Sequence, residues 1–346
     1  MRKGVNPVKG GKPVVKEPCD HRVLIPLFIP HEEDYFKDAY RIFILCLESI
    51  LKTANSKVKV SIISNKCCDA VNQRLLKLYK DKQIDELIIE REGIGKINSL
   101  LKALRTVEER LITITDADVL FLQNWEKEVV KVFEEFPKAG AVCPVPVFRK
   151  QFDLTYNIWR NYFFSNKLRF SKVKDLPALE KFATSIGWTH LPEEFGDTIA
   201  TLESTSGHKA VVGCSHFVAT YKREVFKELP INNSPYLIDG DSELLYLDLP
   251  VIKKGGYRLS TYSNNAFHLG NVHESWMEKE FEQLIEKDNK FIDYTYLSNI
   301  STSTFSYYLD NVIFKKIFKK KSILKWVLKR KGLNNSQLFN YLDRKY

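Results

Sequence analysis

Short apolar runs alternate with longer segments of helical periodicity through the first third of the chain. The apolar runs predict strands at 23–29, 58–63, 86–90 and 111–115, and the periodic segments predict helices at 35–52, 69–79 and 97–104. Asp69 is placed to cap the second of these helices. Strands separated by helices of this length form βαβ units. The pattern therefore predicts an α/β fold with a Rossmann-like, mostly parallel central sheet flanked by helices.

The pattern changes after residue 306, where apolar pairs alternate with clusters of lysine. Within residues 311–331, Ile313, Ile317 and Val327 approach one helical face. One interpretation is a helix that lies on an anionic membrane surface with its aromatic side chains buried. The other is a helix packed on the rest of the protein with a solvated basic face. The sequence leaves both open.

The bulk composition narrows the class of protein without choosing a function. The chain has 346 residues and a net charge of +10, which suits acidic partners such as nucleic acid, anionic lipid or phosphate-bearing substrates. Its six cysteines form no Cys-x-x-Cys pair, so we expect reduced thiols in the cytoplasm and no zinc site or disulfide framework. No apolar run approaches ~18 residues, and the start of the chain has no apolar stretch typical of a signal peptide.

Two acids follow the fourth predicted strand, at Asp116 and Asp118. Ligands of such sheets bind beyond the carboxyl ends of the strands. Two neighbouring carboxylates repel each other unless a cation lies beside them. Mg²⁺ or Mn²⁺ prefers such oxygen ligands together with diphosphate oxygens, and it neutralises charge as a phosphate leaves. The alternative for an isolated Asp-x-Asp is a solvated turn, but the position after a βαβ series favours a site.

This segment and several others resemble a known family. Residues 112–121 are similar to the Asp-x-Asp segment of GT-A-fold glycosyltransferases, particularly the family 2 type. The other similar segments are 23–30 (first strand), 93–98 (loop and helix start), 212–226 (acceptor-side strand and turn), 239–244 (acidic motif) and 254–258. Their order spans about residues 22–270. The resemblance implies a GT-A fold and a nucleotide-sugar donor.

The resemblance also implies a donor site and a metal site. The implied donor contacts are Pro26, Phe28, Asn65, Lys96, Asp116, Ala117 and Asp118. The implied ligands of Mn²⁺ or Mg²⁺ are Asp116, Asp118 and His268. Lys96 opens a predicted helix, where free N–H groups would help it meet phosphate, although an exposed charge at a helix end is the alternative. Asn65 replaces an acid that often contacts the nucleoside, so UDP is expected and GDP stays open.

Inverting transfer needs a carboxylate that takes the proton from the acceptor hydroxyl. Asp241 fits the family's acidic motif best, and Asp239, separated from it by Gly240, is the second choice. Both acids could instead cap the helix that follows. On the acceptor side, His216 and Trp188 are the candidates.

An aromatic stripe lies in the part of the chain that has no clear family match. Phe152, Tyr156, Trp159 and Phe163 fall on one helical face. Such a stripe is usually part of a core. Because aromatic rings also stack on sugars, an acceptor wall or lid is the alternative.

Three rival functions explain less of the sequence. A haloacid-dehalogenase phosphatase carries its Asp-x-Asp after the first strand, whereas here it follows the fourth. A nucleotidyltransferase shares the architecture, but no glycine-rich, lysine-bearing loop follows residues 23–30. A basic nucleic-acid-binding protein leaves the acidic motifs unexplained, so no nucleic acid partner is expected.

The expected organisation has three parts. Residues 1–20 form a flexible basic tail, 21–275 a catalytic domain, and 276–346 a helical, basic amphipathic extension. Within the catalytic domain, 21–125 is the nucleotide-sugar half and 126–275 the acceptor half. The expected reaction moves a sugar to a glycan or lipid-linked glycan in surface polysaccharide synthesis. Residues 311–331 would place the enzyme peripherally on the inner face of the plasma membrane if the membrane interpretation holds.

Overall fold

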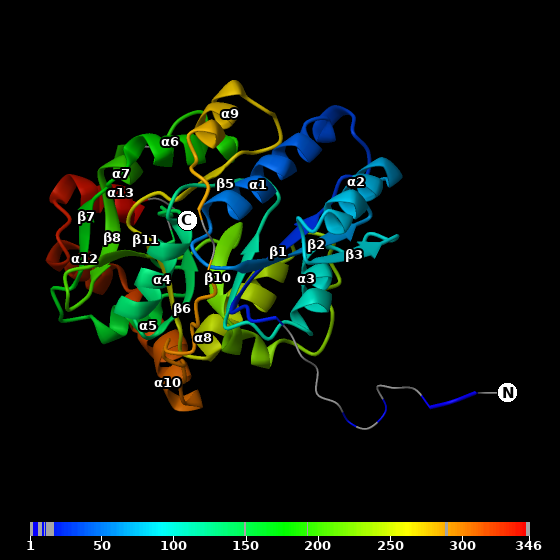
Figure 1. Ribbon diagram of the computed structural model, residues 1–346. Helices are drawn as coiled ribbons and strands as arrows, with labels where there is room; N and C mark the ends of the chain where they lie inside the picture. The colour runs from blue at the N-terminus through cyan, green and yellow to red at the C-terminus, as the bar shows by residue number, and fades with distance from the viewer. Residues whose placement is uncertain are drawn as a thin grey trace.

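The computed structural model describes residues 3–5, 9, 11, 17–148, 150–191, 193–287 and 290–343 (Figure 1). Most of the tail predicted at 1–20 therefore lies outside the described residues. The strands are β1 (His21–Leu27), β2 (Val58–Asn65), β3 (Glu86–Glu90), β4 (Leu111–Thr115), β5 (Val119–Phe121), β6 (Ala139–Cys143), β7 (Leu168–Lys172), β8 (Thr198–Glu203), β9 (Lys209–Val212), β10 (Val218–Lys222), β11 (Tyr257–Thr261) and β12 (Ala266–His268).

Helices connect and flank these strands. The α-helices are α1 (Ala39–Thr53), α2 (Asp69–Lys80), α3 (Lys96–Leu104), α4 (Trp125–Glu135), α5 (Tyr156–Asn161), α6 (Leu176–Ser185), α7 (Glu193–Asp197), α8 (Leu249–Lys253), α9 (Ser275–Glu282), α10 (Thr304–Tyr308), α11 (Lys315–Phe318), α12 (Lys321–Arg330) and α13 (Asn335–Asp343). Short 3₁₀ segments are η1 (Asp34–Phe36) and η2 (Arg223–Glu228), and π-helical segments are η3 (Leu244–Asp248) and η4 (Leu309–Phe314).

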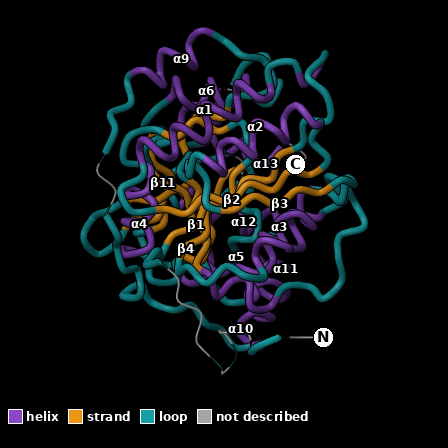
Figure 2. Tube along the Cα trace, turned by 45° about the vertical axis from the view of Figure 1, so that its right-hand side comes forward, coloured by secondary structure: helices purple, strands orange, loops and turns teal. Residues whose placement is uncertain are grey.

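One large sheet organises the described part of the molecule, in the order β3-β2-β1-β4-β10-β6-β11-β9-β8-β7. Its first four members run parallel, as the βαβ pattern predicts. β10 then inserts antiparallel between β4 and β6, and antiparallel pairs join β9, β8 and β7. α1, α2, α6 and α9 lie above the strands and α3, α5 and α10 below them (Figures 1 and 2). The predicted α/β architecture with a helix-flanked central sheet is confirmed.

Apolar burial explains why most predicted elements formed. The strands β3 and β4 have the predicted bounds, and every residue of β4 is buried. The helix predicted at 35–52 begins later instead: α1 starts at Ala39, and the 3₁₀ turn η1, in which Asp34 has a φ of 46°, precedes it. Asp69 is the first residue of α2 and Cys68 is its N-cap, so the predicted side-chain cap is wrong.

The aromatic stripe is part of the core, as its spacing predicts. Only Tyr156–Asn161 is helical there, but Tyr156 and Trp159 are buried and Phe152 packs 5.2 Å from the Trp159 ring. Phe318 of the C-terminal extension enters the same cluster, with its ring 5.2 Å from that of Trp159. Phe318 therefore completes the main hydrophobic cluster of the protein.

Further contacts hold the C-terminal extension in place. Val327 and Leu328 of α12 are buried in the main hydrophobic cluster. The buried Lys331 donates hydrogen bonds from Nζ to the carbonyls of Tyr162 and Ser165, at 2.7 Å each. No helix in the described ranges is long and apolar enough to cross a bilayer. The predicted apolar face is therefore divided: Val327 packs against the protein, whereas Ile313 and Ile317 are 40% and 45% exposed.

Candidate donor and acceptor sites

The predicted donor residues gather at one edge of the sheet. β1, β2 and β4 are parallel, so Phe28, Asn65 and Asp116 follow or end neighbouring strands at their carboxyl ends. Phe28 is exposed there and packs edge-on against Phe36, at 5.7 Å between ring centroids. Pro26, inside β1, and Ala117, after β4, are both half-buried. This edge is where ligands of parallel sheets bind.

Lys96 reaches the first acid of the Asp-x-Asp segment. Its Nζ lies 2.5 Å from Asp116 Oδ1 and 3.7 Å from a carboxylate oxygen of Glu243. Burial acts to lower the pKa of Lys96, but the Asp116 carboxylate, followed by Glu243 and Asp118, outweighs burial and raises it. The ammonium group therefore stays charged beside the two motifs.

Asp118 and His268 meet across a small two-stranded sheet. β12 pairs antiparallel with β5, which sets His268 opposite Val119, and Leu269 N–H donates to the Asp118 carbonyl at 2.7 Å. As a result His268 Nε2 lies 3.5 Å from Asp118 Oδ2. His268 Nδ1 lies 3.0 Å from Ser185 Oγ, so a histidine that donates its Nδ1 proton there keeps Nε2 free to bind a cation.

One oxygen of this pair fits a metal. Asp118 Oδ1 is buried and has no hydrogen-bond partner among the described residues. Burial raises the pKa of Asp118, and His268 opposes that rise. A buried carboxylate oxygen without a donor is costly unless a ligand meets it. Within the described part of the chain no cluster of three or more His, Cys, Asp or Glu side chains forms a metal site. Asp118 and His268 are the two side chains here that could contribute ligands to a cation.

The loop before α3 is locked by backbone contacts. Gly95 has a φ of +87°, and a Cβ there would lie 2.7 Å from the Tyr236 carbonyl oxygen. Asn98 exchanges two hydrogen bonds of 2.9 Å with the backbone of Ser234. Asn65 Oδ1 accepts a hydrogen bond from Ile94 N–H at 2.9 Å, so this predicted donor residue also holds the loop. These contacts join the start of α3 to the segment that precedes the acidic motif.

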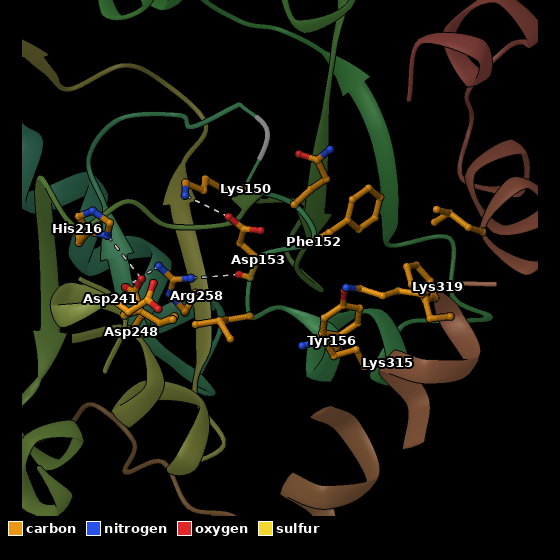
Figure 3. Close-up of a pocket in the computed structure, with 15 residues that line it drawn as sticks. Lys150, Phe152, Asp153, Tyr156, His216, Asp241, Asp248, Arg258, Lys315 and Lys319 are labelled. Carbon is orange, nitrogen blue, oxygen red and sulfur yellow. Dashed lines mark hydrogen bonds and ion pairs between the residues drawn. The ribbon is translucent and has the colours of Figure 1, made fainter. Parts of the chain in front are cut away.

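The side chains of the acidic motif, residues 239–244, lie at two different sites. Glu243 turns toward Lys96, whereas Asp241 lines a cavity of about 650 Å³ (Figure 3). Asp239, Gly240 and Asp241 all have positive φ, near +60°, and the exposed Asp239 is not among the cavity residues. His216, predicted on the acceptor side, lines the same cavity as Asp241.

A buried ion pair supports this cavity. Arg258 donates to Asp248 Oδ1 at 2.6 Å and to the carbonyl of Cys214 at 2.7 Å. His216 Nδ1 lies 3.5 Å from the other oxygen of Asp248. Burial acts to raise the pKa of Asp248, but Arg258 and His216 outweigh it and hold that pKa below its ordinary value. The carboxylate therefore fixes both Arg258 and His216.

Several of these residues were not predicted as site residues. Glu243 and Arg258 stand in the similar segments 239–244 and 254–258, which is the signal that could have found them. Ser185 and Asp248 have no such signal. Trp188, predicted to contact the acceptor, packs 5.3 Å from Phe148 in a second hydrophobic cluster and is not among the residues lining the cavity.

The family model described as "Glycosyl transferase family 2" matches residues 43–229, more than half of the chain. No curated protein matches the chain. The mannosyltransferase PcManGT from Pyrobaculum calidifontis, solved with GDP-Man and Mn²⁺, is similar at 14% identity and a TM-score of 0.43, over 93% of this chain and 77% of that one. GalNAc-T7, solved with UDP, GalNAc and Mn²⁺, has 13% identity and a TM-score of 0.45, over 78% and 48%. S. aureus TarS 1-349 has 9% identity and a TM-score of 0.42, over 90% and 81%.

Proposed function

The chain belongs to glycosyl transferase family 2, so it is a glycosyltransferase, and we propose that it moves a sugar from a nucleotide-diphosphate sugar to an acceptor hydroxyl. UDP is the expected nucleotide. The donor assignment rests on the pair Asp118 and His268, which lies beside the Lys96–Asp116 ion pair. In this pair Asp118 Oδ1 is buried and has no hydrogen-bond partner among the described residues. A cation and a diphosphate complete this arrangement chemically.

Mn²⁺ or Mg²⁺ would be held by Asp118 and His268, and by Asp116 directly or through water. Such an ion neutralises the charge that develops on the leaving diphosphate. Lys96 supplies a second, fixed positive charge next to the same acids. Asp116 and Glu243 hold the Lys96 ammonium group at this edge of the sheet, so it is placed to bind a phosphate oxygen.

The acceptor hydroxyl needs a base on the other side of the transferred sugar. Asp241 lines the cavity with His216 and is exposed, so it can meet a hydroxyl group. We assign Asp241 the role of taking the hydroxyl proton, which makes the transfer inverting. A glycan or lipid-linked glycan, as in surface polysaccharide synthesis, is the proposed acceptor.

The donor assignment is tested by calorimetric titration of UDP with and without Mn²⁺. In the wild-type protein Mn²⁺ should strengthen UDP binding. Asp118→Asn should remove this metal-dependent part while leaving the melting temperature near that of the wild type, because Asp118 Oδ1 makes no hydrogen bond in the described structure. Asp153→Asn, in the acceptor-side cavity, is the matched control and should keep the Mn²⁺ effect. An unchanged Mn²⁺ effect in Asp118→Asn would refute the assignment.

The outer side of the extension supports a membrane contact. Ile313, Ile317 and Trp326 are 40–49% exposed there, between lysines that also face outward. Apolar side chains and lysines on one surface bind anionic lipid through burial and charge together. The full-length chain should therefore co-sediment with vesicles that contain anionic lipid, and less so as salt rises. Equal sedimentation with neutral vesicles, or none with either, would argue for a soluble acceptor.

A further inference from the structure

The acceptor-side cavity is built from the middle of the chain and from its C-terminal extension. One wall holds His216, Asp241 and Asp248, and the opposite wall holds Lys315 and Lys319 of the C-terminal extension (Figure 3). Its volume of about 650 Å³ suits a ligand the size of a small glycan.

Two of the four cations around the cavity are already neutralised. Arg258 is almost fully buried and pairs with Asp248 at 2.6 Å. Lys150 pairs with Asp153 at 3.1 Å. Neither ion pair leaves a strong net charge for a ligand to meet.

Lys315 and Lys319 differ from these two. They stand four residues apart, at the first residue of α11 and just after its end, so they lie on one side of the helix. Neither has an acidic partner among the described residues, and the charged contact that Lys315 makes is with the face of the Tyr156 ring, at 5.6 Å. Burial and the nearby Asp153 raise the pKa of Tyr156 to about 12, so this phenol stays neutral. Two uncompensated positive charges therefore face the cavity.

Asp241 makes the two sides of the cavity opposite in charge, which would orient a ligand. An anionic group on a ligand is repelled by Asp241 and attracted by Lys315 and Lys319, which lie across the cavity (Figure 3). A ligand hydroxyl is free to approach Asp241. Between the two ends, the half-buried ring of Phe152 provides apolar contact for a sugar ring.

We propose that the acceptor is a phosphate-bearing sugar, bound by its phosphate at Lys315 and Lys319 with a hydroxyl directed to Asp241. Lysine binds phosphate as a compact point charge, and two on one helical side suit a single phosphate group. The assignment rests on the proposed transfer to an acceptor hydroxyl, and it names the chemical class of that acceptor.

The test uses glucose 6-phosphate as the probe and glucose as its uncharged counterpart. Both are titrated calorimetrically into the full-length protein saturated with UDP and Mn²⁺, so that the donor site is filled. Glucose 6-phosphate should bind at least about tenfold more tightly than glucose, which is the scale of one charge-assisted hydrogen bond. The double variant Lys315→Ala/Lys319→Ala should lose this difference.

Matched variants separate the site from general basicity. Lys316→Ala/Lys320→Ala removes the same charge from exposed neighbours that do not line the cavity, and it should keep the preference for glucose 6-phosphate. The charge-conserving variant Lys315→Arg/Lys319→Arg should also keep the preference for glucose 6-phosphate. A loss of the preference in this variant would indicate that substitution at these positions disturbs folding. Binding of UDP with Mn²⁺ should be the same in every variant.

Several results would overturn the proposal. These are equal affinity for glucose and glucose 6-phosphate, no binding of either at millimolar concentration, or an equal loss in the control lysine variant. If UDP with Mn²⁺ still binds in those cases, only the acceptor class is wrong. If UDP with Mn²⁺ fails to bind the wild-type protein, the proposed donor site itself is refuted.

Discussion

At the scale of single residues, the acidic motif offers two candidate bases with different surroundings. Asp241 lines the acceptor-side cavity, whereas Asp239 does not and its carbonyl accepts hydrogen bonds from Ser242. We expect Asp241→Asn to lower the rate of transfer by about 10²–10⁴-fold, because a general base contributes that much. Affinity for UDP with Mn²⁺ should persist. Transfer assays with Asp239→Asn provide the control, and a loss in that variant alone would move the base to Asp239.

A second residue-scale prediction concerns a buried acid away from the site. Glu126 accepts hydrogen bonds from the backbone N–H groups of Asn55 and Ser56 and lies 2.7 Å from His21 Nδ1. Burial acts to raise its pKa, but His21 and Ser56 outweigh burial and lower it from 4.5 to about 2. This shift corresponds to roughly 3 kcal/mol of stability.

The sign of this effect fixes its pH window. Because the folded pKa lies below the unfolded one, the stabilisation is complete above pH 4.5 and is lost as the pH falls to about 2. Glu126→Gln should therefore lower the free energy of unfolding at neutral pH. Its difference from the wild type should shrink over that acid window in urea titrations. A constant difference across the window would contradict the role of the charge.

Much of the donor site was predicted from the types of residue that follow a buried strand. Asp116, Asp118 and Lys96 come together in space because strand ends and helix starts meet at one edge of a parallel sheet. His268 reaches Asp118 through a strand of three residues, too short for any periodicity to reveal. Its placement came from the family resemblance. Ser185 is 83 residues away in sequence from its partner His268, so local pattern could not have indicated that contact.

At the scale of elements, the turn before α3 couples the donor loop to the acidic motif. Gly95→Ala places a Cβ 2.7 Å from the Tyr236 carbonyl at a φ of +87°. Gly207 has the same φ with nothing within 4 Å, so Gly207→Ala isolates the backbone strain. Both variants should lose about 1–3 kcal/mol of stability. Gly95→Ala alone should weaken binding of UDP with Mn²⁺, measured by calorimetry, because Lys96 follows it. Equal affinities in the two variants would show that the contact does not matter.

Elements with strong periodicity or full burial were predictable, and irregular ones were not. β4 has its predicted bounds because a continuous apolar run suits a buried parallel strand, and the half-buried edge strand β3 also has its predicted bounds. The aromatic stripe predicted a longer helix than α5, since its rings pack from a turn and a short helix together. The π-helical η3, next to the acidic motif, has no sequence signal that propensity could detect.

At the scale of the whole molecule, the C-terminal extension is part of the core. Phe318 is 2% exposed and contacts the aromatic cluster, whereas Phe305 is 70% exposed. Phe318→Ala should cost about 3–5 kcal/mol, and the matched Phe305→Ala should stay within about ±0.5 kcal/mol. Chemical denaturation of both variants measures the difference. Similar stabilities would mean that the extension does not dock on the domain in solution.

The sequence alone could not place this extension. Its apolar face is consistent with a bilayer surface or with a protein core, because both are apolar. Which side of the extension faces the protein is determined by an aromatic cluster far away in the sequence. The Phe318 ring packs there against Phe152, Tyr156 and Trp159. The boundary predicted between a catalytic domain at 21–275 and an extension at 276–346 stays a prediction. The main hydrophobic cluster contains residues from both sides of it.

The insertion of β10 between β4 and β6 has a consequence for the newly made chain on the ribosome. β4 pairs with β1 on one side and with β10 on the other, so one of its edges waits for residues about a hundred positions later. At about 5–20 residues per second, this wait lasts on the order of 5–20 s. An apolar strand with an open edge is a template for pairing with other chains. The nascent protein is therefore exposed to aggregation through β4 while residues 116–217 are being translated, and a chaperone that shields β4 during this interval would raise the yield of folded enzyme.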